Sequence, residues 1–467
     1  MDPGGFVSVL SRGEYQTLLD LIDRAGVALR GRVIWNVNST PAGGGVAELL
    51  RPLLGYCRGS DVDARWVVIS AGADFFALTK RLHNRLHGVP GDGGALGQAE
   101  RSVYERTLAA NAAELVRLVS SRDIVILHDP QTAGIVQAVR GTGAAVIWRC
   151  HVGLDHPNER AREAWDFLRP YVQPADAYVF SRAAFAWEGL DQDKICVIQP
   201  SIDVFSPKNA DQSTEQSLAI LAKAGILTAR GGVGATFTRS NGALGRVDRR
   251  ADVLQEESLS PADRLVTQVS RWDWLKDPLG VLRGFTEHVP LQVEAHLLLA
   301  GPSTQAVPDD PEGAEVLAAV REAWFGLPRE LKRRVHLASL PMDDVEENAA
   351  VVNALQRHSV VVVQKSLAEG FGLTVAEAMW KERPVVASRI GGIQDQIVDG
   401  VSGLLLSDPC DASQFGSAVT GLLAHADRAR QMGAAARERV QSNFLGPPHL
   451  GHYFELIQRL IADRVSS

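Results

Sequence analysis

Two carboxylates eight positions apart border the stretch of this sequence that most clearly could bind a ligand or take part in catalysis. Glu369 and Glu377 flank a glycine-rich turn, Gly370-Phe371-Gly372, which follows the apolar run 360–363. That run is typical of a strand buried on both faces of a parallel sheet, and residues 373–381 favour a helix. Backbone N–H groups at the start of a helix lack intrahelical partners, and glycines let an anion approach them. The stretch therefore predicts a phosphate site bordered by carboxylates.

A second group of charged residues lies where another strand, expected at 265–270, ends. Arg271 places a fixed cation there, and Lys276 places a mobile one five positions further on. A guanidinium can bond two oxygens of a diphosphate at once, and an ammonium group attracts the diphosphate as a point charge. This pattern predicts a diphosphate site. Salt bridges to Asp273 or Asp277 are the alternative, just as a plain turn with solvated carboxylates is the alternative for the first stretch.

Polar and glycine residues also follow the first strand expected in the N-terminal half. Asn38 ends this strand, and three consecutive glycines, Gly43, Gly44 and Gly45, come soon after it. Such a run can present backbone N–H groups to a phosphate or a sugar. It is neither a GxGxxG motif nor a P-loop, and a tight turn is the simpler interpretation.

Two histidines and an aspartate stand in comparable places. His128 and His151 each follow or end an expected strand, and Asp155 lies just beyond the second. A histidine in such a position is often only a hydrogen-bonded loop residue. Taken together, these side chains outline a polar rim at one edge of a predicted sheet.

Strands and helices alternate throughout the chain, and they set the positions of all these residues. The expected strands are 32–38, 66–70, 123–128, 145–149, 177–180 and 195–198, then 265–270, 296–300, 335–337, 360–364, 384–388 and 403–406. The alternation predicts an α/β protein with two Rossmann-like, doubly wound parallel-sheet domains that face a central cleft. In open sheets of this kind, ligands bind at the carboxyl ends of the strands, where the residues above lie.

The length of the chain supports two domains. A chain of 467 residues is too long for one ordinary core. We expect one domain over 1–205 and a second over 206–445. The glycine- and arginine-rich stretch 231–251 shows no periodicity and is interpreted as a flexible surface insertion.

Charge and cysteine usage limit the classes of function. The net charge is −7 and the pI is near 6.0, so no basic field indicates nucleic-acid binding. The 4 cysteines are scattered without metal-ligand spacing, which favours reduced thiols. The pattern of a secretory leader is missing from the first residues, and no apolar stretch is long enough to span a membrane. These features predict a cytoplasmic protein with small-molecule substrates and no membrane partner, and they leave a homodimer open.

The assembled motifs resemble those of GT-B glycosyltransferases, in the large retaining family that includes sucrose and glycogen synthases. The resemblance rests on Arg271 with Lys276 and on the Glu-x7-Glu pair, Glu369 and Glu377. Within that family the chain most closely resembles trehalose synthases of the glycosyltransferring type, which join glucose from a nucleoside diphosphate glucose to free glucose, reversibly. The matching stretches cover nearly the whole chain and are 35–40, 43–48, 63–66, 148–151, 200–203 and 369–375.

The resemblance implies a role for each candidate residue. The catalytic residues would be Arg271, Lys276, Glu369 and His151, with the two cations stabilising the departing diphosphate and His151 near the reacting carbon. Glu377 would bond the ribose hydroxyls. The donor would be held by Gly43, Gly44, Gly45, Arg271, Lys276, Glu369, Gly370, Phe371, Gly372, Leu373, Thr374 and Glu377. The acceptor-side residues would be Asn38, His128 and Asp155.

The same resemblance implies an arrangement of domains and a course for the reaction. The first domain would take the acceptor and the second the nucleotide-sugar, with a C-terminal helix, 446–467, packing back on the first. Front-face attack would retain configuration, with the departing phosphate accepting the proton and with no metal or other cofactor. Double displacement would instead need two carboxyls about 5 Å apart. Ala368 departs from the family pattern, since many relatives carry a polar or basic residue there.

Other functions are compatible with parts of this pattern. A trehalose phosphorylase, or another retaining glucosyltransferase, would differ mainly in its acceptor. A nucleotide-sugar epimerase would need acid and base groups around the sugar ring, and a non-catalytic sensor would bind the donor without releasing diphosphate. The base of the donor nucleotide also stays open.

Overall fold

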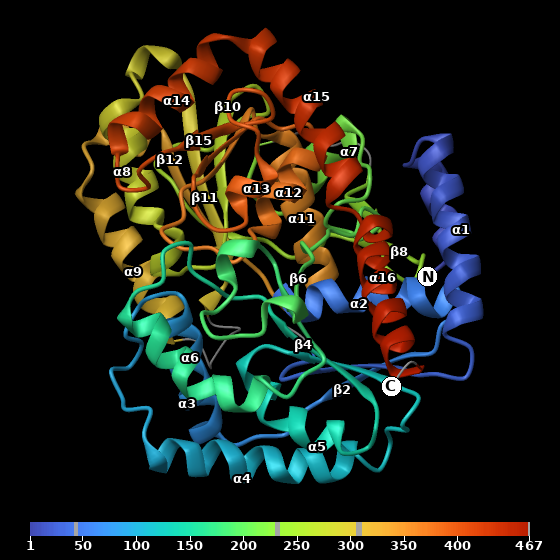
Figure 1. The fold of residues 1–467 in the computed structure, drawn as a ribbon. Coiled ribbons are helices and arrows are strands. Elements are labelled where there is room, and N and C mark those ends of the chain that lie inside the picture. Colours follow the sequence, from blue (N-terminus) through green and yellow to red (C-terminus); the bar gives the residue numbers. More distant parts are fainter. Residues whose placement is uncertain (42–44, 229–233, 305–310, 466–467) are drawn as a thin grey trace. The chain divides into compact units, whose positions relative to one another are not determined.

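The chain forms two compact units, each built on a largely parallel sheet. The computed structural model describes residues 1–41, 45–228, 234–304 and 311–465 (Figure 1). Unit 1 consists of Met1–Ser201 with Asn443–Ser467, and unit 2 of Ile202–Ser442. These boundaries lie a few residues from those expected from the sequence. The predicted α/β fold, with a parallel sheet in each half, is confirmed.

The sheet of unit 1 is parallel throughout its described strands. Its 6 strands lie in the order β2-β1-β3-β4-β5-β6. They are β1 (Ile34–Asn38), β2 (Ala64–Val68), β3 (Ile124–His128), β4 (Ala145–Cys150), β5 (Ala177–Phe180) and β6 (Ile195–Val197). All residues of the central strands β1, β3, β4 and β5 are buried, as expected for a sheet covered on both faces.

Helices cover both faces of this sheet because successive strand residues point in opposite directions. Val125 and Leu127 of β3 belong to the core shared with α3 to α6, whereas Ile124 and Ile126 belong to the core shared with α1 and α16. The helices are α1 (Arg12–Ala28), α2 (Gly45–Gly59), α3 (Ala73–Leu86), α4 (Gln98–Leu115), α5 (Val136–Arg140), α6 (Glu159–Val172) and α16 (Gly446–Val465). The last helix of the chain is thus part of the first unit.

The sheet of unit 2 has 7 described strands in the order β15-β14-β13-β10-β11-β12-β9. They are β9 (Asp252–Leu254), β10 (Arg264–Val269), β11 (Ala295–Pro302), β12 (Val335–Leu340), β13 (Val361–Gln364), β14 (Val385–Ser388) and β15 (Leu404–Leu406). All pair in parallel except the edge strand β9, which runs antiparallel to β12. The short strand β9 was not among the strands expected from the sequence.

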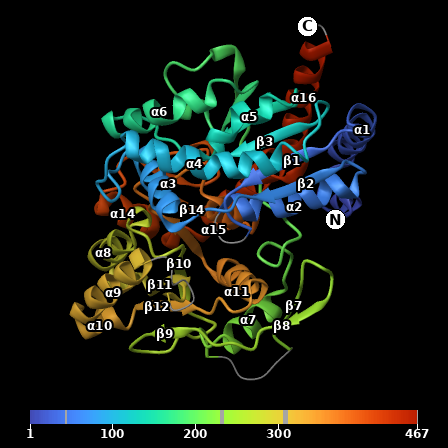
Figure 2. The same cartoon turned by 90° about the horizontal axis from the view of Figure 1, so that it is seen from below.

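The helices of unit 2 lie on both sides of its sheet. Figure 2 shows α8, α9 and α10 on one side of β10 to β12, and α7 and α11 on the other. The helices are α7 (Thr214–Lys223), α8 (Pro278–His288), α9 (Pro311–Gly326), α10 (Arg329–Lys332), α11 (Val345–His358), α12 (Leu373–Trp380), α13 (Ile393–Gln396), α14 (Ala412–Ala424) and α15 (Ala426–Asn443). Short 3-10 helices of the two units span Pro3–Ser8, Pro130–Ile135, Ala183–Phe185, Gln192–Lys194, Trp274–Lys276 and Leu291–Val293.

The stretch expected to be a flexible insertion contains ordered structure. Strands β7 (Thr236–Thr238) and β8 (Leu244–Arg246) form an antiparallel hairpin. Phe237 and Val247 are buried in the core that α7 and α11 share. Arg239 also pairs with Asp344 at 2.6 Å. The structure therefore corrects the expectation over 236–247, because two isolated apolar residues anchor the segment without giving it a visible period.

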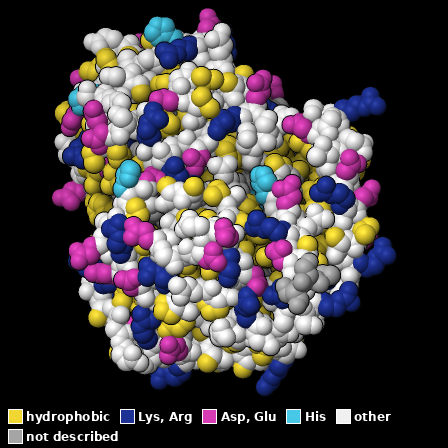
Figure 3. Space-filling model, in the orientation of Figure 1, with side chains coloured by type: hydrophobic (Ala, Val, Ile, Leu, Met, Phe, Trp, Pro, Cys, Tyr) yellow, Lys and Arg dark blue, Asp and Glu magenta, His cyan; other side chains and the backbone are white. Residues whose placement is uncertain are grey.

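Charges of both signs are interspersed over the face of the molecule in Figure 3. This distribution agrees with the net charge of −7 and differs from the single-sign patch that would attract a polyanion. Of the helices that the structure describes, none is both long enough and apolar enough to cross a membrane.

Two adjacent aromatic residues of α9 test the packing of unit 2. Trp324 is 4% exposed and donates a hydrogen bond to the carbonyl of Val335 at 2.8 Å, whereas Phe325 is 61% exposed. Trp324→Ala should destabilise unit 2 by about 3–5 kcal/mol, because it leaves a cavity and an unpaired acceptor. Phe325→Ala should change stability by less than about 0.5 kcal/mol. Urea unfolding followed by circular dichroism measures both, and equal midpoints for the two variants would contradict this packing.

Candidate active site

The predicted donor residues of unit 2 gather where β10 and β13 end, and these strands are neighbours in its sheet. Lys276, in the loop after β10, forms an ion pair with Glu369, in the loop after β13. The backbone N–H of Leu367 donates to the carbonyl of Leu275 at 2.7 Å, so the two loops are also joined through their main chains. The structure thus brings together a cation and a carboxylate that lie 93 positions apart in the sequence.

A second ion pair, which is more deeply buried, supports the loop after β10. Lys365, which is 2% exposed, pairs with Asp277. Asp277 has a left-handed backbone, with φ of 48°, and its carboxylate accepts the N–H of Gly280 at 3.0 Å at the start of α8. Gln268 of β10 donates to the carbonyl of Lys276 at 2.7 Å. The position of Lys276 is therefore fixed by partners on both sides of it in the sequence.

Arg271 lies in the same loop but reaches towards solvent. Its Nη2 is 3.0 Å from Oδ2 of Asp273, and its side chain is 56% exposed. Asp273 also accepts the N–H of Leu275 at 2.8 Å. The alternative salt bridge considered for Arg271 is therefore present, whereas Lys276 pairs with Glu369 rather than with Asp277. Because the Arg271 side chain is largely exposed, this ion pair is weak.

The glycine turn is held in shape by a second loop that sequence reasoning missed. Gly372 has φ of 85° and immediately precedes α12, which begins with Leu373 and Thr374. The N–H of Gly392 donates to the carbonyl of Gly370 at 3.0 Å. A Cβ atom at Gly391 would lie 1.8 Å from the carbonyl oxygen of Glu369. The two loops therefore touch through their backbones, which explains the Gly-Gly pair after β14.

Glu377 is buried within α12 and is 1% exposed. Its Oε1 lies 3.3 Å from Nζ of Lys208, a residue that sequence reasoning did not connect with the site. Thr374, one turn earlier in the helix, bonds Oε1 of Gln364 at 3.4 Å, and Phe371 is buried beside the turn. The end of β13 and the first turns of α12 thus form one polar cluster.

The sequence-predicted residues of unit 1 form a separate group at the ends of β1, β3 and β4. His128 and His151 stack with ring centroids 5.4 Å apart, and Nδ1 of His128 lies 3.1 Å from Nε2 of His151. Nε2 of His128 lies 3.1 Å from Oδ1 of Asn36. Arg149 donates from Nε to Nδ1 of His151 at 3.4 Å. The structure therefore brings these two histidines into direct contact.

The other residues predicted for unit 1 have partners of their own. Asn38 accepts a hydrogen bond from Nε1 of Trp66 at 2.8 Å, and Asp155 pairs with Arg182 at 2.6 Å. Gly45 is the first residue of α2. Gly43 and Gly44 lie outside the described residues.

Burial sets the protonation of the histidine pair. It lowers the pKa of His128 to about 3, and the positive charge of Arg149 acts in the same direction. Burial, together with Arg149, also holds the pKa of His151 well below its usual range. Both imidazoles are therefore neutral near pH 7. Burial raises the pKa of the Asp129 carboxyl to about 7, although the N–H of His151 opposes this shift.

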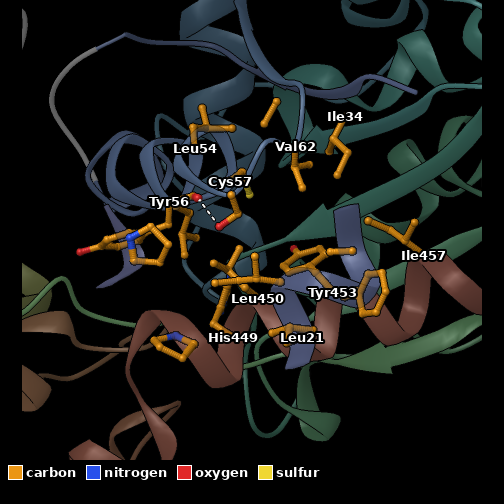
Figure 4. Close-up of a pocket in the computed structure, with 18 of the residues that line it drawn as sticks. Leu21, Ile34, Leu54, Tyr56, Cys57, Val62, His449, Leu450, Tyr453 and Ile457 are labelled. Atoms are coloured by element: carbon orange, nitrogen blue, oxygen red, sulfur yellow. Dashed lines mark hydrogen bonds between the residues drawn. The ribbon is translucent and has the colours of Figure 1, made fainter. Parts of the chain in front are cut away.

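An apolar cavity of about 110 Å³ lies within unit 1, on the side of the sheet that faces α1, α2 and α16. Figure 4 shows Tyr453 and His449 of α16 on its wall, together with Tyr56 and Cys57 of α2. His128 also lines this cavity. The apolar surroundings explain why charged forms are disfavoured here, and they raise the pKa of Cys57 to about 11.

In the part of the chain that the structure describes, no three His, Cys, Asp or Glu side chains come together as they do around a metal ion.

Comparisons with known proteins show the family to which the chain belongs. Residues 36–187 match the family described as "Trehalose synthase, N-terminal domain", and residues 344–439 match "Glycosyl transferases group 1". The chain is 34% identical to the trehalose synthase of Pyrococcus horikoshii over 92% of this chain and 91% of that protein. It is 25% identical to a trehalose phosphorylase of Pleurotus sajor-caju, over 79% of this chain and 50% of that protein.

The fold also resembles solved structures. The α,α-trehalose-phosphate synthase (UDP-forming) of Burkholderia xenovorans, solved with glucose-6-phosphate, aligns with a TM-score of 0.65. The identity is 16%, and the alignment covers 92% of this chain and 100% of that one. The two parallel-sheet units share the GT-B fold of that structure, and the match to group 1 glycosyl transferases makes the chain a GT-B glycosyltransferase. The chain belongs to the trehalose synthase family, and it is a trehalose-related glycosyltransferase.

The lowered histidine pKa values predict a loss of stability in acid. His128 and His449 have pKa values of about 3 in the folded protein against 6.5 as the ordinary value, and the pKa of His151 is lowered too. Between pH 6.5 and 3 the unfolded chain therefore binds more protons, so stability falls as pH falls through this range. Asp129 opposes this trend, because its raised pKa adds stability that is lost as pH rises from about 4 to 7.

The three histidines contribute more to the pH dependence of stability than the one carboxyl does. The melting temperature should therefore fall as the pH is lowered from 7.5 to 5. Scanning calorimetry measures this change. His449→Asn keeps a donor for the carbonyl of Gln199, which His449 contacts through Nδ1 at 2.6 Å, and should reduce the pH dependence. A melting temperature that rises on acidification would show that these histidines are not buried in neutral form.

Proposed function

We propose that this enzyme transfers glucose from a nucleoside diphosphate glucose to free glucose and forms trehalose with retention of configuration. The observation that carries the proposal is the ion pair of Lys276 with Glu369 beside the glycine turn that begins α12. Membership of the trehalose synthase family supports glucose as the acceptor. The donor is assigned to unit 2 and the acceptor to unit 1.

The donor diphosphate finds complementary charge on unit 2. Lys276 and Arg271 supply two cations from one loop, and the first N–H groups of α12 add the positive end of a helix dipole. Negative charge grows on the diphosphate as the bond to glucose breaks. Groups that are already in place stabilise this charge without reorganising, and this effect is usually the largest electrostatic contribution to catalysis.

In this proposal the two glutamates bind different parts of the donor. Glu369 accepts hydrogen bonds from hydroxyls of the transferred glucose, while the backbone of 370–374 contacts the sugar and the phosphates. Glu377 bonds the ribose hydroxyls, and its Oε1 lies 3.3 Å from the ammonium group of Lys208. Binding the donor moves Lys276 from Glu369 towards phosphate, so that Glu369 becomes available to the sugar.

The acceptor side combines a neutral imidazole with a carboxylate. In this proposal the partly exposed ring of His151 lies against the acceptor, and Asp155 offers acceptor oxygens to its hydroxyls. Asn38 is 3% exposed and bonds Trp66 and the carbonyl of Thr40, so it supports the end of β1. Asp155 is already oriented by Arg182 at 2.6 Å. The departing phosphate accepts the proton of the attacking hydroxyl on the same face of the sugar, which retains the configuration. The proposal includes no metal ion.

Phosphorolysis of trehalose is the second candidate, favoured by the weaker match to the Pleurotus sajor-caju trehalose phosphorylase. In that reaction inorganic phosphate replaces the nucleotide as the group that leaves or attacks. A phosphate would provide an anion for Arg271 and Lys276. It has no ribose, however, and so would not use Glu377, the carboxylate proposed to bond the ribose hydroxyls. The two functions are separated by supplying trehalose with phosphate in the absence of nucleotide.

Release of nucleoside diphosphate tests the proposal. UDP-, ADP- and GDP-glucose are each incubated with the enzyme, with and without free glucose and with and without a chelator. We expect release from at least one donor to depend on glucose and to resist the chelator, with α,α-trehalose identified by its anomeric proton signals. Phosphate-dependent breakdown of trehalose without nucleotide would favour the phosphorylase. Release that glucose does not change would refute the proposed acceptor.

Substitution of the two cations should slow turnover. Lys276→Met keeps the aliphatic stem but removes the charge, and should lower kcat about 100-fold to 1,000-fold because it removes stabilisation of the leaving diphosphate. Arg271→Met should act in the same direction. Lys223→Met is the matched control, since Lys223 also lies in unit 2 and its side chain is 52% exposed, with a carboxylate 4.0 Å away. Equal kcat values for Lys276→Met and Lys223→Met would remove Lys276 from the mechanism.

A further inference from the structure

Four side chains of unit 1 form one continuous chain of hydrogen bonds. Arg149 contacts His151 at 3.4 Å, His151 contacts His128 at 3.1 Å, and His128 contacts Asn36 at 3.1 Å. Asn36, His128 and Arg149 are buried, and only His151 is partly exposed. Both ring nitrogens of His128 are therefore engaged inside the protein.

The residues at the two ends of this hydrogen-bond network determine where its protons lie. Arg149 can only donate, so Nδ1 of His151 accepts from it. A neutral His151 then carries its proton on Nε2 and donates to Nδ1 of His128. His128 in turn carries its proton on Nε2 and donates to Oδ1 of Asn36, which can only accept. The four residues thus have one self-consistent direction of hydrogen bonding, with both imidazoles in the same tautomer.

We propose that His128 is a positioning residue, which together with Arg149 fixes the tautomer and the ring orientation of His151. This proposal rests on the proposed function, in which the partly exposed ring of His151 faces the acceptor. It revises the expected role of His128, because the His128 ring is 3% exposed, whereas the His151 ring is partly exposed.

The backbone at His151 is fixed by a different residue of the same loop cluster. The N–H of His151 donates to Oδ1 of Asp129 at 2.7 Å. Asp129 has a left-handed backbone, with φ of 64°, and its own N–H donates to the carbonyl of Arg149 at 2.7 Å. A non-glycine residue in this conformation is strained and persists only where its surroundings fix it. Ring and backbone of His151 are therefore held independently.

The last helix of the chain supports the far end of the network. Nη1 of Arg149 contacts the hydroxyl of Tyr453 at 3.1 Å, and the guanidinium lies 5.8 Å from the centre of the Tyr453 ring. Figure 4 shows Tyr453 on α16 among the residues that line the cavity. Arg149 is fully buried, so this contact orients a charge that water does not reach.

Two substitutions of nearly equal size separate a positioning role from direct contact. His128→Asn places an oxygen near the position of Nδ1 and can still accept from His151. His128→Gln places its polar end near the position of Nε2 and can still donate to Asn36, but it loses the acceptor for His151. We expect His128→Asn to keep kcat within about 10-fold of the wild type and His128→Gln to lose about 100-fold in kcat, with the acceptor KM nearly unchanged.

A raised KM for the acceptor in both His128 variants would overturn the proposal. If His128 contacted the acceptor directly, both variants would raise the KM for the acceptor, and Gln would be no worse than Asn. His452→Asn is the control, because His452 is an exposed residue of the same helix as Tyr453. Melting temperatures of the variants establish that each is folded.

Nuclear magnetic resonance of the wild type labelled with ¹⁵N-histidine provides a readout that needs no turnover. The signals of His151 are assigned by their loss in His151→Gln. We expect a protonated Nε2 and an unprotonated Nδ1 at pH 7, and a change of this pattern in His128→Gln but not in His128→Asn. A proton on Nδ1 in the wild type would overturn the proposal. Because this result is independent of catalysis, it is distinguishable from failure of the proposed transfer reaction.

Discussion

The candidate donor site depends on the ion pair between Lys276 and Glu369. It joins the loops that follow β10 and β13, which are neighbouring strands in the sheet of unit 2. Taking two charges out of water costs free energy, and their attraction offsets that cost only when their geometry is held. The buried pair of Lys365 with Asp277 and the backbone bond between Leu367 and Leu275 hold it. A cation is thereby kept beside the first turn of α12, where a phosphate can take the place of the carboxylate.

Unit 1 applies the opposite principle at its two candidate histidines, which are kept uncharged. The stacked pair of His128 and His151 lies next to the buried charge of Arg149, and that charge together with burial keeps both rings neutral. Neutral donors and acceptors suit sugar hydroxyls, whereas a diphosphate needs cations. The two units thus differ in electrostatics in the way that their proposed ligands differ.

Local patterns in the sequence were enough to predict the parallel strands and the glycine turn before α12, because burial on both faces and backbone freedom leave local signatures. They also placed the charged residues at strand ends. The partners of these residues were not predictable in the same way. Lys208 contacts Glu377 and Tyr453 contacts Arg149 across long sequence separations, and no local period connects them. The hairpin 236–246 was missed because its anchoring residues are isolated.

The proposed donor site assigns binding of the donor diphosphate to Lys276. Titration calorimetry of the wild type and of Lys276→Met, each with a nucleoside monophosphate and with the diphosphate of the same base, tests it most directly. We expect the wild type to bind the diphosphate at least about 10-fold more tightly than the monophosphate, and Lys276→Met to lose most of this preference while still binding the monophosphate. An unchanged preference in Lys276→Met would show that other groups hold the second phosphate and that Lys276 does not.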